Sequence, residues 1–330
     1  MSEADAERCI AERGKPRAAR DVAVHRWVDA TGIIHFSDRA PEGDALDYRV
    51  IDVGDAPSVD VDVSGYDTNL PAETDARAVA DALAIDALLQ RLIGPRANAS
   101  APEPKLALRI IFVQKAETYA QLVSDRKLAD SQGAYSSRDS TIYVRIQASD
   151  AATFAVMRHE IAHAVLHERV GILAIPINEG LAVYAEHLDT ANPAKGTLVD
   201  LESMRPALAA ALPNDPLVAL NELLARDENT FYDNPSGATA TGEGRTPDSR
   251  PAENRREIRY LRAFAVVATL LNNTQGAASL SLLLNEQRND PCRTASAAGL
   301  FDRSYPGGLA QLARDWMDWM KAASASPPKS

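Results

Sequence analysis

Cysteine, positive charge and long apolar runs are all scarce in this sequence of 330 residues. The two cysteines, Cys9 and Cys292, have no metal-ligand spacing to another cysteine or to a histidine, which excludes a thiolate-bound metal. One disulfide between them and two free thiols both fit the sequence. No apolar stretch approaches the length of a transmembrane helix, which is about 20 residues. The net charge of −11, without a basic cluster, argues against nucleic acid or an anionic membrane surface as the main partner.

The start of the sequence also lacks a recognisable targeting segment. Residues 1–22 are polar and charged and contain no apolar core of the kind found in signal peptides, so none is expected in the sequence as given. The apolar content of 45% is ordinary for a globular protein. A chain of this length is expected to fold into one to three domains with a sizeable core.

A helix is predicted over residues 150–170. Asp150 suits the N-cap position, apolar residues recur at helical spacing, and no glycine or proline interrupts the segment. Gly171 suits the first position after the helix, where a left-handed conformation is common.

This predicted helix carries the pattern His-Glu-x-x-His in His159, Glu160 and His163. The four-residue spacing places both imidazoles on one face, about 6 Å apart along the axis, so that they can share one tetrahedral zinc ion. Glu160 lies beside such an ion, and its carboxylate can take a proton from a water that attacks a carbonyl. The alternative is a solvated helix face that happens to carry two histidines.

A third ligand is expected from the segment after Pro176, which predicts a second helix with Glu179 in its first turn. The positive end of the helix macrodipole is another explanation for an acid there. However, a catalytic zinc needs three protein ligands and an open position, and Glu179 on a helix packed against the first would complete a His2Glu set. Glu186 is the fallback ligand. His167 and His187 are predicted not to bind the metal.

The His-Glu-x-x-His pattern and the Asn-Glu-Gly-Leu-Ala element at residues 178–182 resemble the gluzincin metallopeptidases, in particular the bacterial peptidase-MA-like proteins. The resemblance implies an α+β, zincin-like fold, in which a mixed sheet and the active-site helix are followed by a helical subdomain. It also implies one Zn2+ per chain held by His159, His163 and Glu179, with Glu160 as general base and a peptide or protein as substrate. The 15 residues between His163 and Glu179 are fewer than in thermolysin-type and aminopeptidase-type gluzincins.

A second resemblance concerns the N-terminal part of the chain. Two β-rich runs at 24–28 and 33–37 flank a turn with Gly32 and predict a hairpin, to which residues 48–53 could add a third strand as a meander. The order Trp-Val-Asp, Gly, His-Phe-Ser-Asp and Pro within residues 27–41 resembles a small N-terminal domain of many Gram-negative envelope proteins. This resemblance implies a periplasmic or cell-envelope location, with the cytoplasm as the alternative because no signal peptide is expected.

The predicted organisation has five parts. They are a polar N-terminal segment at 1–22, a small β domain at 23–57, a linker at 58–73, a zincin-like metallopeptidase domain at 74–322 and a polar tail at 323–330. In the large domain, strands are predicted at 106–113 and twice within 133–146, and helices at 74–93, 116–126, 150–170, 216–226, 257–271, 280–287 and 308–321. Residues 234–254 are rich in glycine, serine, threonine and proline and are expected to form a long loop.

Two further roles are expected by resemblance to zinc peptidases. Tyr260, followed by Tyr232, is the candidate donor to a tetrahedral oxyanion, although each tyrosine would also suit a buried core. Tyr135 and the strand at 141–146 are candidates for pairing with an extended substrate. The competing function is an envelope binding or scaffold protein with a catalytically silent zincin fold, and a third is zinc-dependent hydrolysis of a non-protein amide. The sequence indicates no oligomeric state.

Overall fold

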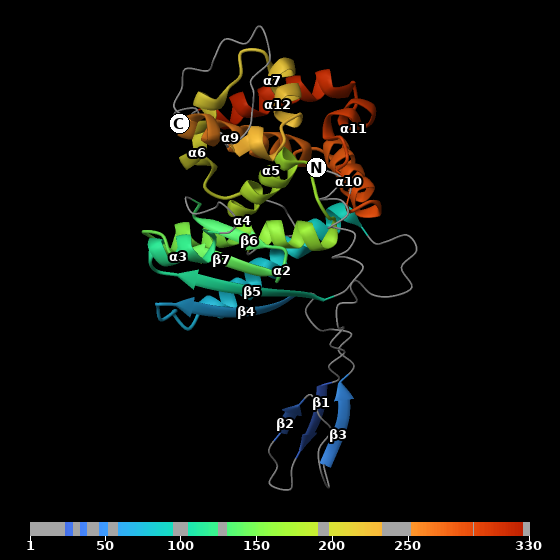
Figure 1. Cartoon of the computed structure of the whole chain (residues 1–330). Coiled ribbons are helices and arrows are strands. Elements are labelled where there is room, and N and C mark those ends of the chain that lie inside the picture. Colours follow the sequence, from blue (N-terminus) through green and yellow to red (C-terminus); the bar gives the residue numbers. More distant parts are fainter. Residues whose placement is uncertain are drawn as a thin grey trace, which may run out of the picture.

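The computed structural model of the chain describes residues 24–28, 34–37, 46–51, 59–94, 105–124, 131–190, 198–232, 252–292 and 294–325. These residues form an α+β protein with two separate sheets (Figure 1). The predicted segments at 1–22 and most of the loop at 234–254 lie outside the described residues, as does most of the polar tail.

The first sheet has three antiparallel strands in the order β2-β1-β3. They are β1 (Val24–Val28), β2 (Ile34–Ser37) and β3 (Leu46–Ile51). The predicted hairpin is therefore confirmed, with Trp27 opposite His35. The third strand begins and ends earlier than predicted and pairs with β1 instead of β2. The sheet is not a meander, because β3 returns to the far side of β1.

The second sheet has four strands in the order β4-β5-β7-β6. They are β4 (Val59–Tyr66), β5 (Leu106–Val113), β6 (Gly133–Ser136) and β7 (Thr141–Arg145). The first three in this order run parallel, and β6 pairs antiparallel with β7. Among the described strands, β4 and β6 lie at the two edges of this sheet, whereas β7 is paired with a strand on both sides.

Strand β4 corrects the prediction of a linker at 58–73. The acidic composition of this segment suggested a loop, but Val59, Val61 and Val63 alternate with acids, and β4 pairs in parallel with β5. The valines are buried or half-buried against the core, whereas Asp60 and Asp62 are exposed. This is the period-two pattern of a half-buried edge strand.

Helices α2 (Thr74–Ile93) and α4 (Asp150–Arg169) pack against each other and against the sheet. Alternate residues of β5, including Leu108, Ile110 and Phe112, enter their core. The short helix α3 (Ala116–Leu122) forms a smaller apolar cluster with other residues of the same sheet and ends four residues before the predicted limit.

The rest of the described chain is helical and lies on the far side of α4 from the sheet (Figure 1). The eight helices of the described residues here are α5 (Ile175–Glu186), α6 (Leu201–Ala211), α7 (Pro216–Leu224), α8 (Glu228–Tyr232), α9 (Ala252–Leu271), α10 (Thr274–Asn289), α11 (Ala297–Ser304) and α12 (Gly308–Ser324). Three of them, α6, α8 and α11, were not predicted.

The structure also bears on two expectations about membrane helices and cysteines. Within the described residues, no helix combines the length and the apolar content needed to cross a membrane, as the sequence led us to expect. Cys292 takes part in a disulfide, so it is not the free thiol that the sequence also allowed. The other cysteine, Cys9, lies outside the described residues.

Candidate metal centre

Helix α4 presents the histidines, and its two ends are fixed by local contacts. Ser149, not the predicted Asp150, is the N-cap, because its hydroxyl accepts a hydrogen bond from the Ala152 N–H at 3.2 Å. At the other end, Gly171 has a φ of 112°, which a residue with a side chain rarely adopts. The helix ends at Arg169, one residue before the predicted limit, and Gly171 follows its C-cap Val170 as predicted.

Helix α5 presents Glu179 toward α4. It begins at Ile175, so Glu179 is its fifth residue, and its first turn contains no acid. The prediction of Glu179 in the first turn was therefore wrong by one position, and attraction to the helix dipole explains it less well, since that effect fades beyond the first turn. Glu179 is only 2% exposed, which is unusual for a carboxylate that lacks a cation.

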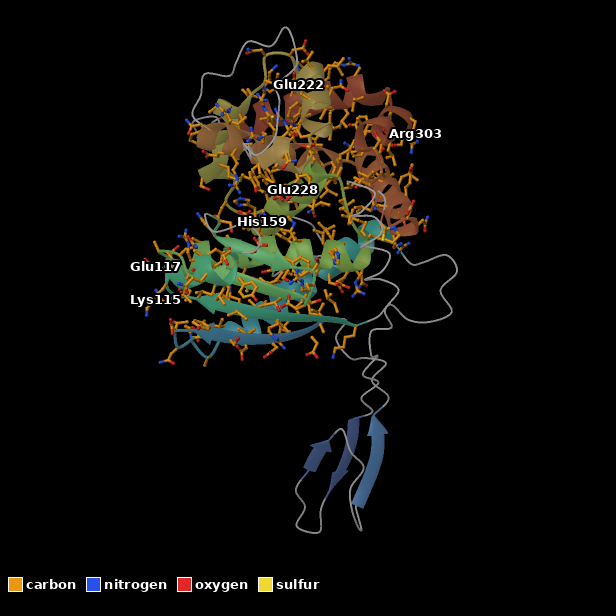
Figure 2. The ribbon with its side chains drawn as sticks, in the orientation of Figure 1. Lys115, Glu117, His159, Glu222, Glu228 and Arg303 are labelled. Atoms are coloured by element: carbon orange, nitrogen blue, oxygen red, sulfur yellow. The ribbon has the colours of Figure 1, made fainter. Side chains whose placement is uncertain are left out.

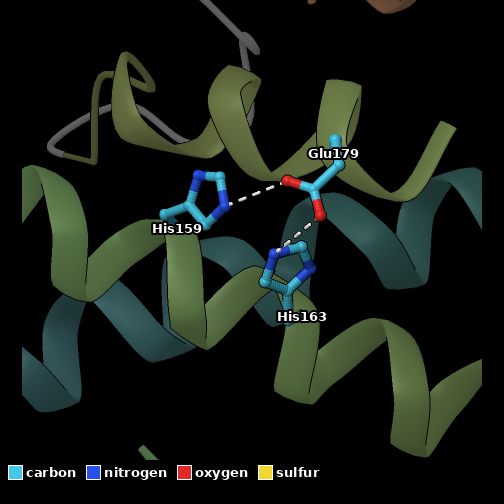
Figure 3. A group of neighbouring side chains, drawn as sticks. All are labelled: His159, His163 and Glu179. Atoms are coloured by element: carbon cyan, nitrogen blue, oxygen red, sulfur yellow. Dashed lines mark ion pairs between the residues drawn. The ribbon is translucent and has the colours of Figure 1, made fainter. Parts of the chain in front are cut away.

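The three predicted ligands meet in space. In Figure 3, His159 and His163 project from one helix toward the Glu179 carboxylate on the other. The Nε2 of His159 lies 3.3 Å from Oε2 of Glu179, and the Nε2 of His163 lies 3.6 Å from its Oε1. One donor atom from each residue lies within 4.8 Å of the other two. The structure thus brings together all three residues that the sequence singled out.

These distances fit a zinc ion. Bonds of about 2.0–2.2 Å from zinc to nitrogen and oxygen place tetrahedral ligand atoms about 3.3–3.5 Å apart. The two measured nitrogen-to-oxygen distances, 3.3 and 3.6 Å, lie close to that range. In addition, the buried Oε2 of Glu179 makes no hydrogen bond within the described structure, and a bound cation would satisfy it. The residues present therefore fit a divalent metal ion.

No model of a known protein family matches this chain, and no curated protein sequence does. The donor atoms are thus the main guide to the metal. Two imidazoles and one carboxylate suit zinc better than calcium or magnesium, which prefer oxygen ligands.

Glu186, the fallback ligand, has a different place. Its Oε1 lies 2.5 Å from Nδ1 of His159, on the side of the ring that faces away from Glu179. A carboxylate at this nitrogen fixes the ring orientation and leaves Nε2 for a metal. Glu186 therefore contacts His159 from outside the cluster of His159, His163 and Glu179.

Arg158 joins the two helices that carry the ligands. Its guanidinium donates to the backbone carbonyl oxygens of Ala185 and Glu186 on α5 at 3.2 and 3.1 Å. It also forms an ion pair of 3.3 Å with the buried Asp81 of α2. These contacts tie the C-terminal end of α5 to the centre of α4.

Glu160 is buried next to the edge strand β6, and the charges of His159 and Glu179 in the cluster act on it. A Cβ atom at Gly133 of β6 would lie 2.7 Å from Cγ and Oε1 of Glu160 and from Cγ1 of Val156, so a larger residue here would force these side chains to move. The Tyr135 backbone N–H also donates to the Glu160 carboxylate. Burial raises the pKa of Glu160 to about 7, and the charge of His159 opposes the shift. A cation bound at the cluster would act in the same direction as His159 and lower the pKa of Glu160, because opposite charge favours the carboxylate.

The pKa values of the ligands reflect their mutual contacts. Burial lowers the pKa of His159, but Glu179 and Glu186 outweigh burial and raise it well above the usual value. Burial lowers the pKa of His163. For Glu179, burial raises the pKa, but His163 and His159 outweigh it and bring the pKa to about 2. Glu179 is therefore a carboxylate, the form that binds metals.

The two predicted tyrosines both reach the site from the helical half. The Tyr232 hydroxyl, on α8, donates a hydrogen bond to Oε1 of Glu179. The Tyr260 ring, on α9, lies 6.3 Å from the His159 ring and 6.4 Å from the Tyr232 ring. The fully buried Phe231 packs against both tyrosines, and its carbonyl accepts a hydrogen bond from Arg259. The tyrosines are therefore held in place and are not incidental neighbours.

His167 and His187, which were predicted not to bind the metal, lie outside the cluster. His167 contacts Tyr135 and Glu168, with its Nδ1 3.4 Å from the Tyr135 hydroxyl. His187 caps the C-terminal end of α5 and packs against Phe264 at 5.9 Å between ring centroids. Neither belongs to the ligand cluster.

Proposed function

We propose that this protein is a zinc-dependent peptidase of the gluzincin type, with a zincin-like fold. The observation that carries the proposal is the convergence of His159, His163 and Glu179 at distances that suit zinc. Glu160 follows His159 directly in the sequence. His159, His163 and Glu179 would hold the ion. When bound, it would supply Lewis-acid chemistry that polarises a peptide carbonyl and makes water more acidic.

Glu160 acts as the general base in this proposal. Its carboxylate takes a proton from the attacking water and later delivers a proton to the leaving amine. Gly133 and the Tyr135 backbone hold the carboxylate at the edge of the sheet, which restricts its orientation.

The edge strand β6 is the proposed site of substrate pairing. It lies beside α4 at one edge of the sheet. Its inner side pairs with β7, and no other strand of the described sheet pairs with its outer side. An extended peptide could therefore add to this edge through backbone hydrogen bonds. The strand at 141–146 was the other candidate, but β7 is paired on both sides, so that prediction was wrong.

Tyr260 is the proposed donor to the oxyanion. The Tyr232 hydroxyl already donates to Glu179, so Tyr232 orients a ligand, whereas Tyr260 faces the ring of His159. Burial and the Glu179 carboxylate raise the pKa of Tyr260, and Arg256 opposes this shift. A protonated hydroxyl can donate to a developing negative charge.

The variant Glu160→Gln tests the mechanism. It should bind zinc as the wild type does and should lose hydrolysis by at least about 100-fold, because an amide cannot accept the proton of the attacking water. Zinc content and cleavage of a mixture of synthetic peptides, followed by mass spectrometry, measure the two properties. A Glu160→Gln protein that cleaves at the wild-type rate would end this mechanism.

The second candidate, an envelope binding or scaffold protein, rests on the separate three-stranded sheet. Removal of residues 1–57 distinguishes the two functions and leaves β4 intact. The shortened protein should carry Cys292→Ser, since the deletion also removes Cys9. A peptidase keeps its activity on small peptides after this change, whereas a binding module loses its partner.

A further inference from the structure

Arg256 lies on α9, one turn before Tyr260, beside the candidate metal centre. Its guanidinium carbon is 5.6 Å from the centre of the Tyr232 ring and 5.7 Å from the centre of the Tyr260 ring. These are the two rings that reach Glu179 and His159. Contact with both aromatic faces orients the guanidinium through cation–π attraction.

Arg256 donates a hydrogen bond to the Tyr260 side chain, but its charge has no ion-pair partner among the described residues. Among the described residues, no carboxylate lies within the 4.0 Å of an ion pair with its guanidinium. Other arginines of the same protein do have such partners: Arg158 pairs with Asp81 and Arg169 with the buried Asp86. The negative charge of Glu179 acts on Arg256 from a distance, but the Glu179 oxygens face the two histidines and Tyr232.

The position of Arg256 also leaves it accessible. Its side chain is half-buried, and α8 and α9 form the side of the site opposite the sheet. In Figure 2, His159 lies between the sheet and Glu228 of α8.

We propose that Arg256 determines substrate specificity by binding a carboxylate of the substrate close to the cleaved bond; this rests on the peptidase function proposed above. A guanidinium presents a planar fork of N–H donors that matches a carboxylate with two parallel hydrogen bonds. The Tyr232 and Tyr260 rings hold this fork beside the metal ligands. The substrate class is therefore an anionic peptide.

The distances suit a peptide that spans both groups. The guanidinium carbon lies 5.7 Å from the Tyr260 ring, which in turn lies 6.3 Å from the His159 ring. Together these two distances place the guanidinium at most about 12 Å from the His159 ring, a span that about four extended residues cover. A carboxylate at this range can come from the C-terminus of a short peptide or from an acidic side chain near the cleaved bond.

The test uses the full chain loaded with zinc and peptides prepared in four forms. Each peptide carries either glutamate or glutamine at varied positions, and has either a free or an amidated C-terminus. Wild type, Arg256→Gln and the control Arg314→Gln are compared. Arg314 lies on the exposed side of α12, where it bonds to Gln311, so its loss changes the net charge equally without touching the site.

Wild type and Arg314→Gln should cleave one carboxylate form with a kcat/KM about 10- to 100-fold above that of its neutral counterpart, as expected for charged hydrogen bonds. In Arg256→Gln this preference should fall to about onefold, while zinc content and thermal stability stay unchanged. The form that is preferred identifies the source of the carboxylate. Equal preference in wild type and Arg256→Gln, or no preference in wild type, would overturn the inference and leave the peptidase function standing.

A binding measurement keeps the two proposals distinguishable. If zinc-loaded wild type cleaves none of the peptides, the peptidase function fails, and the same peptides are then titrated by calorimetry into zinc-loaded Glu160→Gln. Tighter binding of a carboxylate form, lost in the double variant with Arg256→Gln, supports the anion site. Equal binding of all four forms contradicts it.

Discussion

At the scale of single residues, the contact between His159 and Glu186 leads to a prediction about zinc affinity. The variant Glu186→Ala should weaken zinc binding by about 10- to 100-fold, because the His159 ring loses the carboxylate that orients it. Glu186→Gln should recover part of this loss, since the amide oxygen still accepts a hydrogen bond from Nδ1. Competition with a chromogenic chelator measures both affinities. Wild-type affinity in Glu186→Ala would show that the contact does not support the ligand.

Substitution of Gly133 should lower kcat without changing the zinc content. A Cβ in Gly133→Ala would lie 2.7 Å from the Glu160 side chain and would displace the carboxylate. A base misplaced by about 1 Å can cost about 100-fold in rate, so kcat should fall by that order while zinc content stays at the wild-type level. Elemental analysis and peptide kinetics on the same preparation measure both. A drop in zinc content together with kcat would instead indicate a general disturbance of the site.

The ligands could be predicted from the sequence, whereas several of their supporting residues could not. His159, Glu160 and His163 are fixed relative to one another by the period of a single helix. Glu186 follows Glu179 by two turns, so its nearness to the site was visible, but its pairing with His159 depends on how α5 crosses α4. Arg256 reaches the site only through tertiary packing, and no local pattern marks it.

At the scale of elements, the close approach of α5 and α9 explains why the glycine Gly180 follows Glu179. A Cβ at Gly180 would lie 2.5 Å from the backbone oxygen of Ala263 on α9. Gly180→Ala should therefore force α5 and α9 apart and destabilise the protein by about 1–3 kcal/mol, as overpacking does. Denaturant unfolding measures the change.

The matched control is Gly299→Ala in α11, another helical glycine. The contact nearest to its added Cβ would be the Ser296 hydroxyl oxygen at 3.3 Å, which leaves more room than at Gly180. Alanine favours helix over glycine, so this change should be neutral or stabilising by up to about 1 kcal/mol. Equal effects of the two substitutions would mean that close approach of α5 and α9 is not the reason for Gly180.

Two elements with a marked apolar stripe or run matched their predictions, whereas an alternating strand with an acidic face and the short helices did not. Helix α2 and strand β5 begin and end at the predicted residues, because one carries a helical apolar stripe and the other an almost continuous apolar run. Strand β4 was missed because its exposed face is acidic and its partner β5 lies far along the chain. Short helices such as α8 contain too few residues for a period to be visible.

At the scale of the whole molecule, the candidate centre lies where the two halves of the large body meet. Helix α4 packs on the sheet, and α5 packs on the helices of the second half, chiefly α9. A metal ion held by His159 and His163 of α4 and by Glu179 of α5 would join these halves at their interface. Metal binding and the stability of this interface should therefore be linked.

The metal content of protein purified without added zinc tests the central claim most directly. Elemental mass spectrometry should find about one zinc per chain in the wild type, since two imidazoles and a buried carboxylate supply three ligands. Glu179→Gln should contain much less zinc, because it replaces the charged ligand by a neutral amide. A wild type that holds no zinc, even after incubation with the metal, would contradict the account and favour the scaffold function.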